Sequence, residues 1–286
     1  MNSISKSLNA ATIAATAKML RSAKKETILI VEGDEDIALF SNSLGIPRSN
    51  FISCFGKERL MEVFQMAPYP GLDAGTIFLR DADFDNLGHL KRGDVILLTS
   101  DHYDFEMSLL PKRLFGRIFA EFMKHKFDVT HLPASFDKIR APASWIGALR
   151  LLSHTEGLNI DFDDAKLGFI NPKTLLSDVD DMIRYYFARS KADPGDRTVI
   201  HDRLQSLIDG VGDVLKITCG KDFIQVMSLA LNRFFQCCGA TECSAETLSR
   251  MFRISVTQDD VSELNLYPAL KEQVIASGFT WPGHPL

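Results

Sequence analysis

The segment Thr27–Phe40, TILIVEGDEDIALF, constrains the fold of this chain more than any other. Four apolar residues, Ile28–Val31, lead directly into Glu32-Gly33, and a helical pattern of apolar residues begins at once. A short, continuous apolar run that stops at glycine is typical of a buried strand in a parallel sheet. The acidic first turn of the next segment suits the positive end of a helix. The segment therefore predicts a strand followed by a helix, with Glu32 where open α/β sheets place their ligands.

Two later apolar runs also end in acidic residues. Thr76–Leu79 opens into RDADFD, and Val95–Leu98 opens into TSDHYDFE, which ends at Glu106. Because the carboxyl ends of parallel strands lie at one edge of a sheet, three strands in succession deliver acids to the same edge.

Alternation in an extended chain puts Asp81, Asp83 and Asp85 on the same side. Three crowded carboxylates repel one another unless a cation lies between them, and a hard divalent ion with oxygen ligands is the usual solution. Asp81 and Asp83 are the first candidates for metal ligands, and Glu106 and Asp85 follow as ligands of a second metal ion. Glu32 is either another ligand or the general acid or base. The competing interpretation of Asp83 and Asp85 is a capped turn, in which aspartate is common.

These motifs resemble the TOPRIM domain, the catalytic fold of topoisomerases, primases and OLD-family nucleases. The matching residues are Val31-Glu32-Gly33 and Asp81-Ala82-Asp83, and the third acidic strand end follows them in order. A closer resemblance is to the DUF4435 group of TOPRIM proteins, which carry a Tyr-Asp-x-Glu segment and a later Gly-Lys. Those motifs stand here as Tyr103-Asp104-Phe105-Glu106 and Gly220-Lys221.

The resemblance implies roles for individual residues. Glu32 takes the acid–base role, with contact to the metal as a further role, and Mg²⁺ or Mn²⁺ is the implied cofactor. Lys221 is implied as a charge stabiliser, because OLD-type nucleases carry a late lysine and a positive side chain near the scissile phosphate lowers the barrier. The competing interpretation of Lys221 is an exposed lysine that precedes a helix.

The resemblance also implies a function. Some relatives of this kind serve in anti-phage defence beside an ABC-type ATPase, as in PARIS systems, where the TOPRIM partner is a toxic nuclease. It therefore implies an Mg-dependent endonuclease acting as a toxic effector with a P-loop ATPase partner, with RNA, particularly tRNA, as first substrate and DNA as second. A homodimer is a further assembly to be tested. The alternative is a non-catalytic interaction module in a defence complex, although the intact acids argue against a degenerate site.

The chain lacks the sequence motifs of several other enzyme classes. The chain has no G-x-S-x-G, so a serine nucleophile elbow is disfavoured. Neither Gly56-Lys57 nor Gly220-Lys221 belongs to a GxxxxGK[ST] loop, so any ATP requirement falls to a partner. Topoisomerase activity is disfavoured because no companion domain bearing an active-site tyrosine is evident.

Composition places the chain among ordinary globular proteins of the cytoplasm. It has 286 residues with 45% hydrophobic residues, and it contains no apolar run of membrane-spanning length and no signal peptide. The odd number of cysteines, 5, favours reduced thiols over disulfides. Cys237, Cys238 and Cys243 lack a nearby histidine or a CxxC pair, which disfavours a zinc site.

The formal net charge of −5 gives no global basic footprint for nucleic acid, so local patches must supply phosphate contacts. One candidate patch, which a solvated helix face explains equally well, comprises Lys112, Arg113, Arg117, Lys124, His125 and Lys126. Lys57 is electrostatically misplaced at a helix N-terminus; phosphate binding and an exposed lysine without a role are both open.

The predicted fold class is α/β: a TOPRIM-like, Rossmann-like parallel sheet with flanking helices, followed by a mainly helical C-terminal region. The predicted domains are an N-terminal helix in 1–26, an α/β domain in 27–127 and a helical region in 128–286, which can pack as one unit with the α/β core. In the α/β domain we predict strands 27–31, 51–54, 76–80 and 95–99, and helices 34–44 and 57–67.

In the helical region, prolines and apolar faces define the expected elements. Pro133, Pro142 and Pro172 mark predicted breaks between helices. We expect a helix at 172–190, a buried helix at 222–235, and two short helices within 245–277 followed by a tail.

Overall fold

The computed structural model describes residues 9–23, 26–70, 72–73, 75–85, 88–123, 129–163 and 165–276. The chain divides into two compact units, the first formed by Met1–Asp101 and Arg253–Leu286 and the second by His102–Phe252. The first part of this unit ends at Asp101, before the predicted boundary at residue 127. The unit also includes the C-terminal segment Arg253–Leu286, which we had assigned to the helical region. Lys124, His125 and Lys126 of the candidate basic patch, and the predicted tail, lie outside the described residues.

The first unit is built on a five-stranded sheet with the order β2-β1-β3-β5-β4. Its strands are β1 (Ile28–Val31), β2 (Phe51–Ser53), β3 (Thr76–Arg80), β4 (Leu90–Arg92) and β5 (Val95–Thr99). The pairs β1–β2, β1–β3 and β3–β5 are parallel, and only β4 is antiparallel to its neighbour β5. The α/β class, the mostly parallel sheet and the four predicted strands are confirmed, whereas β4 was not predicted.

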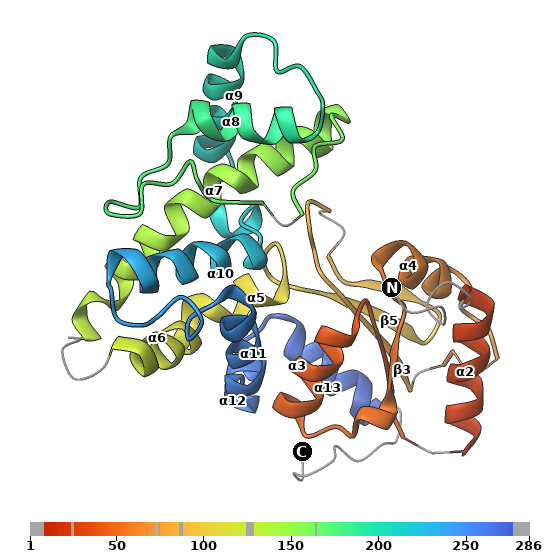
Figure 1. Cartoon of the computed structure of the whole chain (residues 1–286). Coiled ribbons are helices and arrows are strands. Elements are labelled where there is room, and N and C mark those ends of the chain that lie inside the picture. The colour runs from red at the N-terminus through yellow and green to blue at the C-terminus, as the bar shows by residue number, and fades with distance from the viewer. Residues whose placement is uncertain are drawn as a thin grey trace. The chain divides into compact units, whose positions relative to one another are not determined.

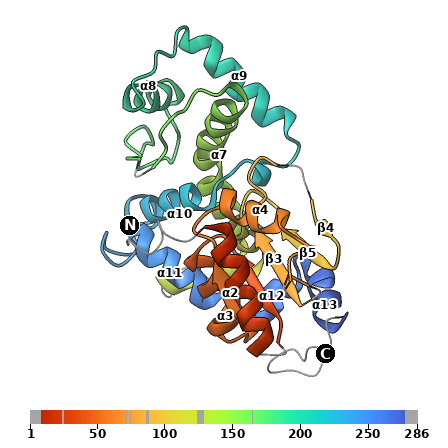
Figure 2. The same cartoon turned by 90° about the vertical axis from the view of Figure 1, so that its right-hand side faces the viewer.

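Helices cover both faces of this sheet (Figures 1 and 2). On one face, a core cluster joins residues of α2 (Ala10–Ala23) and α4 (Lys57–Gln65) to the strands, with Ile13, Leu60 and Phe78 among its members. On the other face lie α3 (Asp34–Leu44) and α13 (Leu266–Ala276). Because every residue of β1 is buried, the sheet has no solvated face there, as its continuous apolar sequence indicates.

The C-terminal segment belongs to the first unit because it completes this second face. It contributes α12 (Gln258–Ser262) and α13, whose Leu266, Leu270 and Val274 are buried. The side chain of Gln273 donates to the backbone carbonyl of Asp94 at 2.7 Å. We predicted two short helices here, and the structure has three, since α11 (Ala245–Ser255) ends before a capping box at Thr257 and Asp260 begins α12.

The second unit is mainly helical, as predicted. Its principal helices are α5 (Phe105–Leu109), α6 (Phe115–Met123), α7 (Leu132–Glu156), α8 (Val179–Arg189), α9 (Arg197–Gly210) and α10 (Gly220–Leu229). The chain continues from α5 through a π-helical turn, η2 (Leu110–Leu114), and from α10 through another, η6 (Ala230–Phe234). The predicted buried helix at 222–235 corresponds to α10 and η6.

Two predictions for this unit were wrong. Pro142 lies inside α7 rather than at a break, because the helix buries Ile139, Ala143 and Ile146 around it and this packing offsets the missing backbone donor. The helix predicted from residue 172 begins only at Val179, where the Asp178 side chain caps it by accepting from the Asp181 backbone. Leu176, which lies within the predicted helix at 172–190, is 70% exposed.

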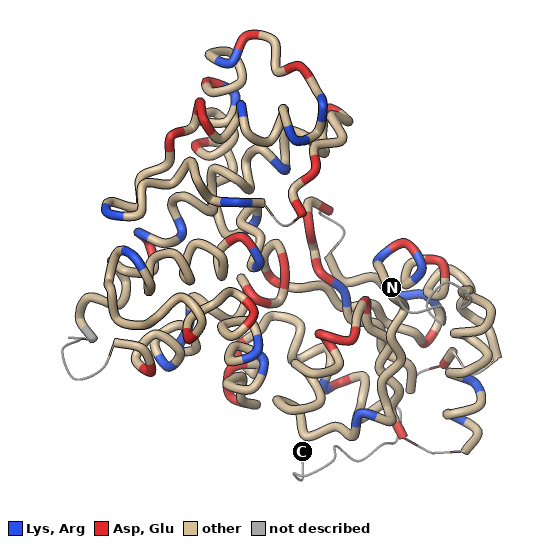
Figure 3. The backbone as a smooth tube through the Cα atoms, in the orientation of Figure 1, with Lys and Arg blue, Asp and Glu red and all other residues tan. Residues whose placement is uncertain are grey.

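Acidic and basic residues are interspersed along the described helices of both units (Figure 3). In the described part of the candidate basic patch, Arg113 and Arg117 are exposed and Lys112 is half-buried. No helix among the described residues is both long enough and apolar enough to cross a membrane.

Candidate functional site

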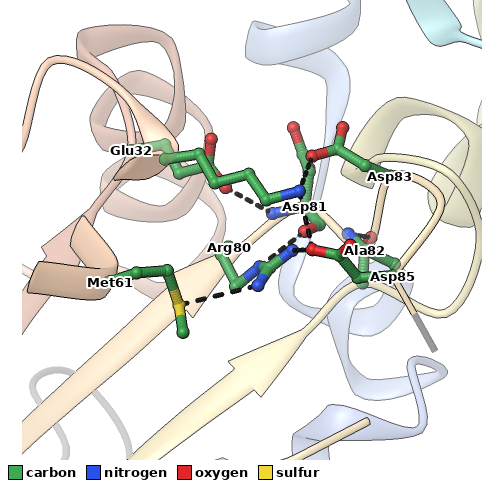
Figure 4. Close-up of polar contacts among 9 residues, drawn as sticks. Glu32, Met61, Arg80, Asp81, Ala82, Asp83 and Asp85 are labelled. Atoms are coloured by element: carbon green, nitrogen blue, oxygen red, sulfur yellow. Dashed lines mark hydrogen bonds and ion pairs between the residues drawn. The ribbon is translucent and has the colours of Figure 1, made fainter. Parts of the chain in front are cut away.

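Glu32 follows β1 directly and joins the ends of three strands. Its Oε1 accepts a hydrogen bond from the Asp81 backbone N–H, just after β3, at 3.1 Å. Its own backbone carbonyl accepts from the Gly56 N–H, beyond β2, at 2.9 Å. The partly buried Glu32 carboxylate is therefore held in place at the carboxyl edge of the sheet, as predicted from the strand pattern (Figure 4).

The loop after β3 carries the three aspartates of the DADFD motif. Asp83 Oδ2 and Asp85 Oδ2 each lie 2.7 Å from Lys57 Nζ. The backbone N–H of Ala82 donates to Ser100 Oγ at 2.8 Å, which ties the loop to the residue after β5. The motif thus forms a defined loop in which one ammonium group bridges two carboxylates, and Lys57 has a partner instead of being an exposed lysine without a role.

Arg80, the last residue of β3, supports this loop from within the sheet. Its side chain is 1% exposed, and it donates to Asp85 Oδ2 at 2.6 Å and to the Asp81 backbone carbonyl at 2.9 Å. A buried guanidinium without these acceptors would be strongly destabilising. The sequence analysis did not identify Arg80 as a site residue. The feature that could have indicated it is a charged residue at the end of an apolar strand.

The charges at this edge shift pKa values in opposite directions. Burial and the nearby Asp83 carboxylate raise the pKa of Glu32. Hydrogen bonds from Arg80 and Lys57 lower the pKa of Asp85. Partial burial opposes the charged form of Lys57, but its hydrogen bonds to Asp83 and Asp85 outweigh burial and raise its pKa. Glu32 is therefore the carboxyl group here that binds a proton more readily than an ordinary glutamate.

The raised pKa of Glu32 predicts a pH-dependent gain in stability for Glu32→Gln in metal-free buffer. The folded state holds the Glu32 proton more tightly than the unfolded chain, so ionisation lowers wild-type stability as pH rises above the ordinary value of 4.5. Glu32→Gln should therefore unfold at a higher denaturant concentration than wild type at pH 7, with the difference vanishing below pH 4.5. Glu62→Gln, on an exposed acid of α4, is the control. An equal effect of Glu32→Gln at both pH values would contradict the assignment.

The side chains at this edge of the sheet are of the chemical type that binds a divalent cation. Asp83 and Asp85 already converge on one positive atom, Lys57 Nζ, and carboxylate oxygens are the ligands that Mg²⁺ and Mn²⁺ prefer. Within the described ranges, however, no three His, Cys, Asp or Glu side chains are gathered closely enough to hold a metal ion. The metal assignment of Asp81, Asp83 and Asp85 consequently stays a prediction.

In the second unit, the structure brings together the two other motifs quoted from the sequence. Asp104 is buried; its Oδ2 accepts from the Gly220 N–H at 2.6 Å, and its Oδ1 accepts from the Met107 N–H at 2.8 Å, which caps α5. Gly220 packs so closely that a Cβ there would lie 2.3 Å from the Cβ of Glu106. Glu106 and Lys221 are thus carried by adjoining helix ends within one unit.

A buried ion pair supports this junction, and sequence reasoning missed it. Asp222, in the first turn of α10, receives two hydrogen bonds from Arg150 of α7, at 2.7 and 3.1 Å. The Arg150 guanidinium also lies over the Phe162 ring, 4.4 Å from its centroid. The only sequence signal was an arginine within the apolar pattern of α7.

All five cysteines lie within the described residues and none forms a disulfide, in agreement with the prediction. Burial raises the pKa of the Cys54 thiol to about 12, so this residue is an unreactive part of the core. Comparison with models of known protein families finds no match to this chain, and no curated protein matches it either.

Proposed function

We propose that this protein is a metal-dependent nuclease of the TOPRIM type that hydrolyses phosphodiester bonds in nucleic acid. The observation that supports this most is the hydrogen bond between the Glu32 carboxylate and the Asp81 backbone. It sets a partly buried acid beside the Asp81-Ala82-Asp83 pair, at the sheet edge where α/β proteins bind ligands. RNA, particularly tRNA, is the first proposed substrate and DNA the second, a preference that rests on the motif resemblance alone.

Glu32 is the proposed general acid–base. Hydrolysis of a phosphodiester requires a proton to leave the attacking water and a proton to reach the leaving oxygen. The raised pKa of Glu32 supports this role, because a carboxyl group that titrates nearer neutral pH accepts and returns a proton more effectively.

Asp81 and Asp83, with Asp85 beside them, are the residues proposed to hold Mg²⁺ or Mn²⁺. When bound, such an ion offsets charge on the phosphoryl oxygens and lowers the pKa of a coordinated water. Lys57, in the first turn of α4, keeps the Asp83 and Asp85 carboxylates oriented.

Glu106 and Lys221 are the proposed contributions of the second unit. Glu106 is assigned to a second metal ion and Lys221 to stabilising charge on the phosphate. The bond between Asp104 and Gly220 joins the helix ends that carry Glu106 and Lys221, and the two assignments rest on the motif resemblance.

A substrate panel tests the proposal. The full chain is incubated with total RNA, tRNA, single-stranded DNA and duplex DNA, each with Mg²⁺, with Mn²⁺ or with a chelator. We expect cleavage that needs the metal and is lost in Asp81→Asn and Asp83→Asn, with calorimetry showing weaker Mg²⁺ binding in both. Asp34→Asn, an exposed acid in the first turn of α3, is the matched control. Unchanged Mg²⁺ binding in both variants would show that the motif does not bind the metal.

A non-catalytic interaction module is the second candidate, and one observation favours it. Lys57 bridges Asp83 and Asp85 without a metal ion, so these two carboxylates have a cationic partner within the chain itself. This candidate predicts that no nucleic acid in the panel is cleaved under any metal condition.

The resemblance extends the proposal to regulation, with the nuclease as a toxic effector of anti-phage defence activated together with a P-loop ATPase of the ABC type. Toxicity in cells should then require both Glu32 and activation of the partner. Equal toxicity of wild type and Glu32→Ala would reject the nuclease and favour the interaction module.

A further inference from the structure

Phe55 is an exposed aromatic residue in the turn between β2 and α4. Its side chain is 43% exposed, and it is the only aromatic residue among the exposed large apolar side chains of the described residues. A single exposed apolar residue is common on protein surfaces, so the exposure of Phe55 matters only together with its backbone conformation and its neighbours.

The backbone of Phe55 is also strained. Its φ of 56° lies in the left-handed region, which a bulky side chain rarely adopts, and the following Gly56 has a φ of 130°. Strain of this kind persists only where the surrounding structure enforces it, and it gathers at functional sites. Neither burial nor local backbone preference accounts for phenylalanine at this position.

Three contacts hold the turn against the candidate site. The Gly56 N–H donates to the Glu32 backbone carbonyl at 2.9 Å, and Lys57 Nζ lies 2.7 Å from carboxylate oxygens of both Asp83 and Asp85. A further hydrogen bond lies within the turn itself, where the Phe55 N–H donates to Ser53 Oγ at 3.3 Å. Phe55 therefore directly precedes Gly56, which binds Glu32, and it stands two residues before Lys57, which bridges the aspartates.

The space beside the turn is open. A Cβ added at Gly56 would meet no atom within 4 Å. An exposed aromatic face with room beside it is a feature on which proteins stack unpaired bases of single-stranded nucleic acid. Bases within a duplex are already stacked on their neighbours and do not offer a free face to a side chain.

We propose that Phe55 stacks on an unpaired nucleobase of a single-stranded nucleic acid, with the adjoining phosphodiester directed toward the candidate site. This inference rests on the proposed function, since it places the stacked nucleotide beside the phosphodiester that Glu32 acts on. It narrows the substrate class to single strands and to the unpaired loops of structured RNA.

Equilibrium binding tests the proposal, in the full chain with Glu32→Gln to prevent cleavage. Fluorescence anisotropy is measured with labelled oligouridylate, oligothymidylate and a duplex of equal length, so that the arms separate RNA from DNA. Because stacking on an aromatic residue strengthens binding by about five- to 150-fold per base, Phe55→Leu should weaken binding to single strands within that range. Leucine retains apolar volume but lacks the aromatic face, and Phe55→Trp should restore binding.

The controls separate stacking from a structural role. Leu176→Ala, at an apolar side chain that is 70% exposed in the second unit, should leave single-strand binding unchanged. Duplex binding should be the same with and without the Phe55→Leu substitution. Loss of duplex and single-strand binding together, or equal single-strand binding with and without Phe55→Leu, would overturn the inference. Absence of any oligonucleotide binding would overturn it as well.

The two proposals fail separately. If wild-type protein cleaves nucleic acid but Phe55→Leu binds single strands normally, the stacking role is wrong and the nuclease remains. If single-strand binding depends on Phe55 but no substrate is cleaved, the nuclease is wrong and the nucleobase contact remains.

Discussion

Replacing Glu32 with Gln is expected to slow cleavage of nucleic acid by about 10²- to 10⁴-fold, which is the usual contribution of a general acid or base. Glutamine has the shape of glutamate and retains a carbonyl oxygen that accepts from the Asp81 backbone, so the junction between β1 and β3 should persist. It cannot take up or release a proton in the pH range of the reaction. The loss therefore reports proton transfer and not a damaged sheet.

Single-turnover cleavage at saturating enzyme, with melting curves for each variant, measures this effect. Glu35→Gln is the matched control, because Glu35 is only three residues away and its side chain is 60% exposed. The expected outcome is a reduced rate for Glu32→Gln alone, with both variants folded. A rate within a few-fold of wild type would remove Glu32 from the acid–base role.

The α/β part of the fold was predictable because its strands are buried on both faces. Continuous apolar runs leave few alternatives, and the predicted helix at 34–44 coincides with α3, whose acidic first turn and Gly45 at the C-terminus mark both ends. The short strand β4 was missed because Leu90–Arg92 is largely exposed and carries no apolar run. Its signal was the Gly93-Asp94 turn before Val95, a two-residue hairpin connection.

The domain boundary was not predictable from local pattern. The return of α13 to the sheet depends on contacts between segments far apart in sequence, such as Gln273 with Asp94. The positions of Pro142 and of the start of α8 could not be predicted for the same reason. Tertiary packing keeps α7 continuous through Pro142, and the capping side chain of Asp178 sets where α8 begins.

At the candidate site, the acids were predictable and their partners were not. Strand ends place Glu32 and Asp81 at one edge, and this requires only the parallel topology. The expected alternation of an extended chain was wrong beyond β3, because Asp83 has a φ of 48° and the Asp85 N–H donates to the Ala82 carbonyl, which closes a turn. Which cation balances them depends on side-chain positions, and the structure gives that role to Lys57 and Arg80. Sequence had raised Lys57 only as a candidate phosphate ligand or as an exposed lysine without a role.

Gly220→Ala is expected to destabilise the second unit by about 2–5 kcal/mol, although helix propensity alone favours alanine by about 0.5–1 kcal/mol. The added Cβ would lie 2.3 Å from the Cβ of Glu106 and 2.9 Å from Asp104 Oδ1. Relieving that overlap requires α5 and α10 to separate, which would stretch the 2.6 Å bond between the Gly220 N–H and the buried Asp104 carboxylate. Overpacking and a weakened buried charged hydrogen bond act in the same direction.

Gly210→Ala is the matched control, because it also lies in a helix of the second unit, at the end of α9, and an added Cβ there would meet no atom within 4 Å. It should leave stability unchanged or raise it slightly. Urea unfolding followed by tryptophan fluorescence reports this unit through Trp145, in α7, when the other tryptophan, Trp281, is replaced with phenylalanine in every variant. If Gly220→Ala and Gly210→Ala shifted the midpoint equally, the close contact between the two motifs would be wrong. If only Gly220→Ala lowers it, and cleavage falls under conditions where the variant is still folded, then the Tyr-Asp-x-Glu and Gly-Lys motifs act as one supporting element for Glu106 and Lys221.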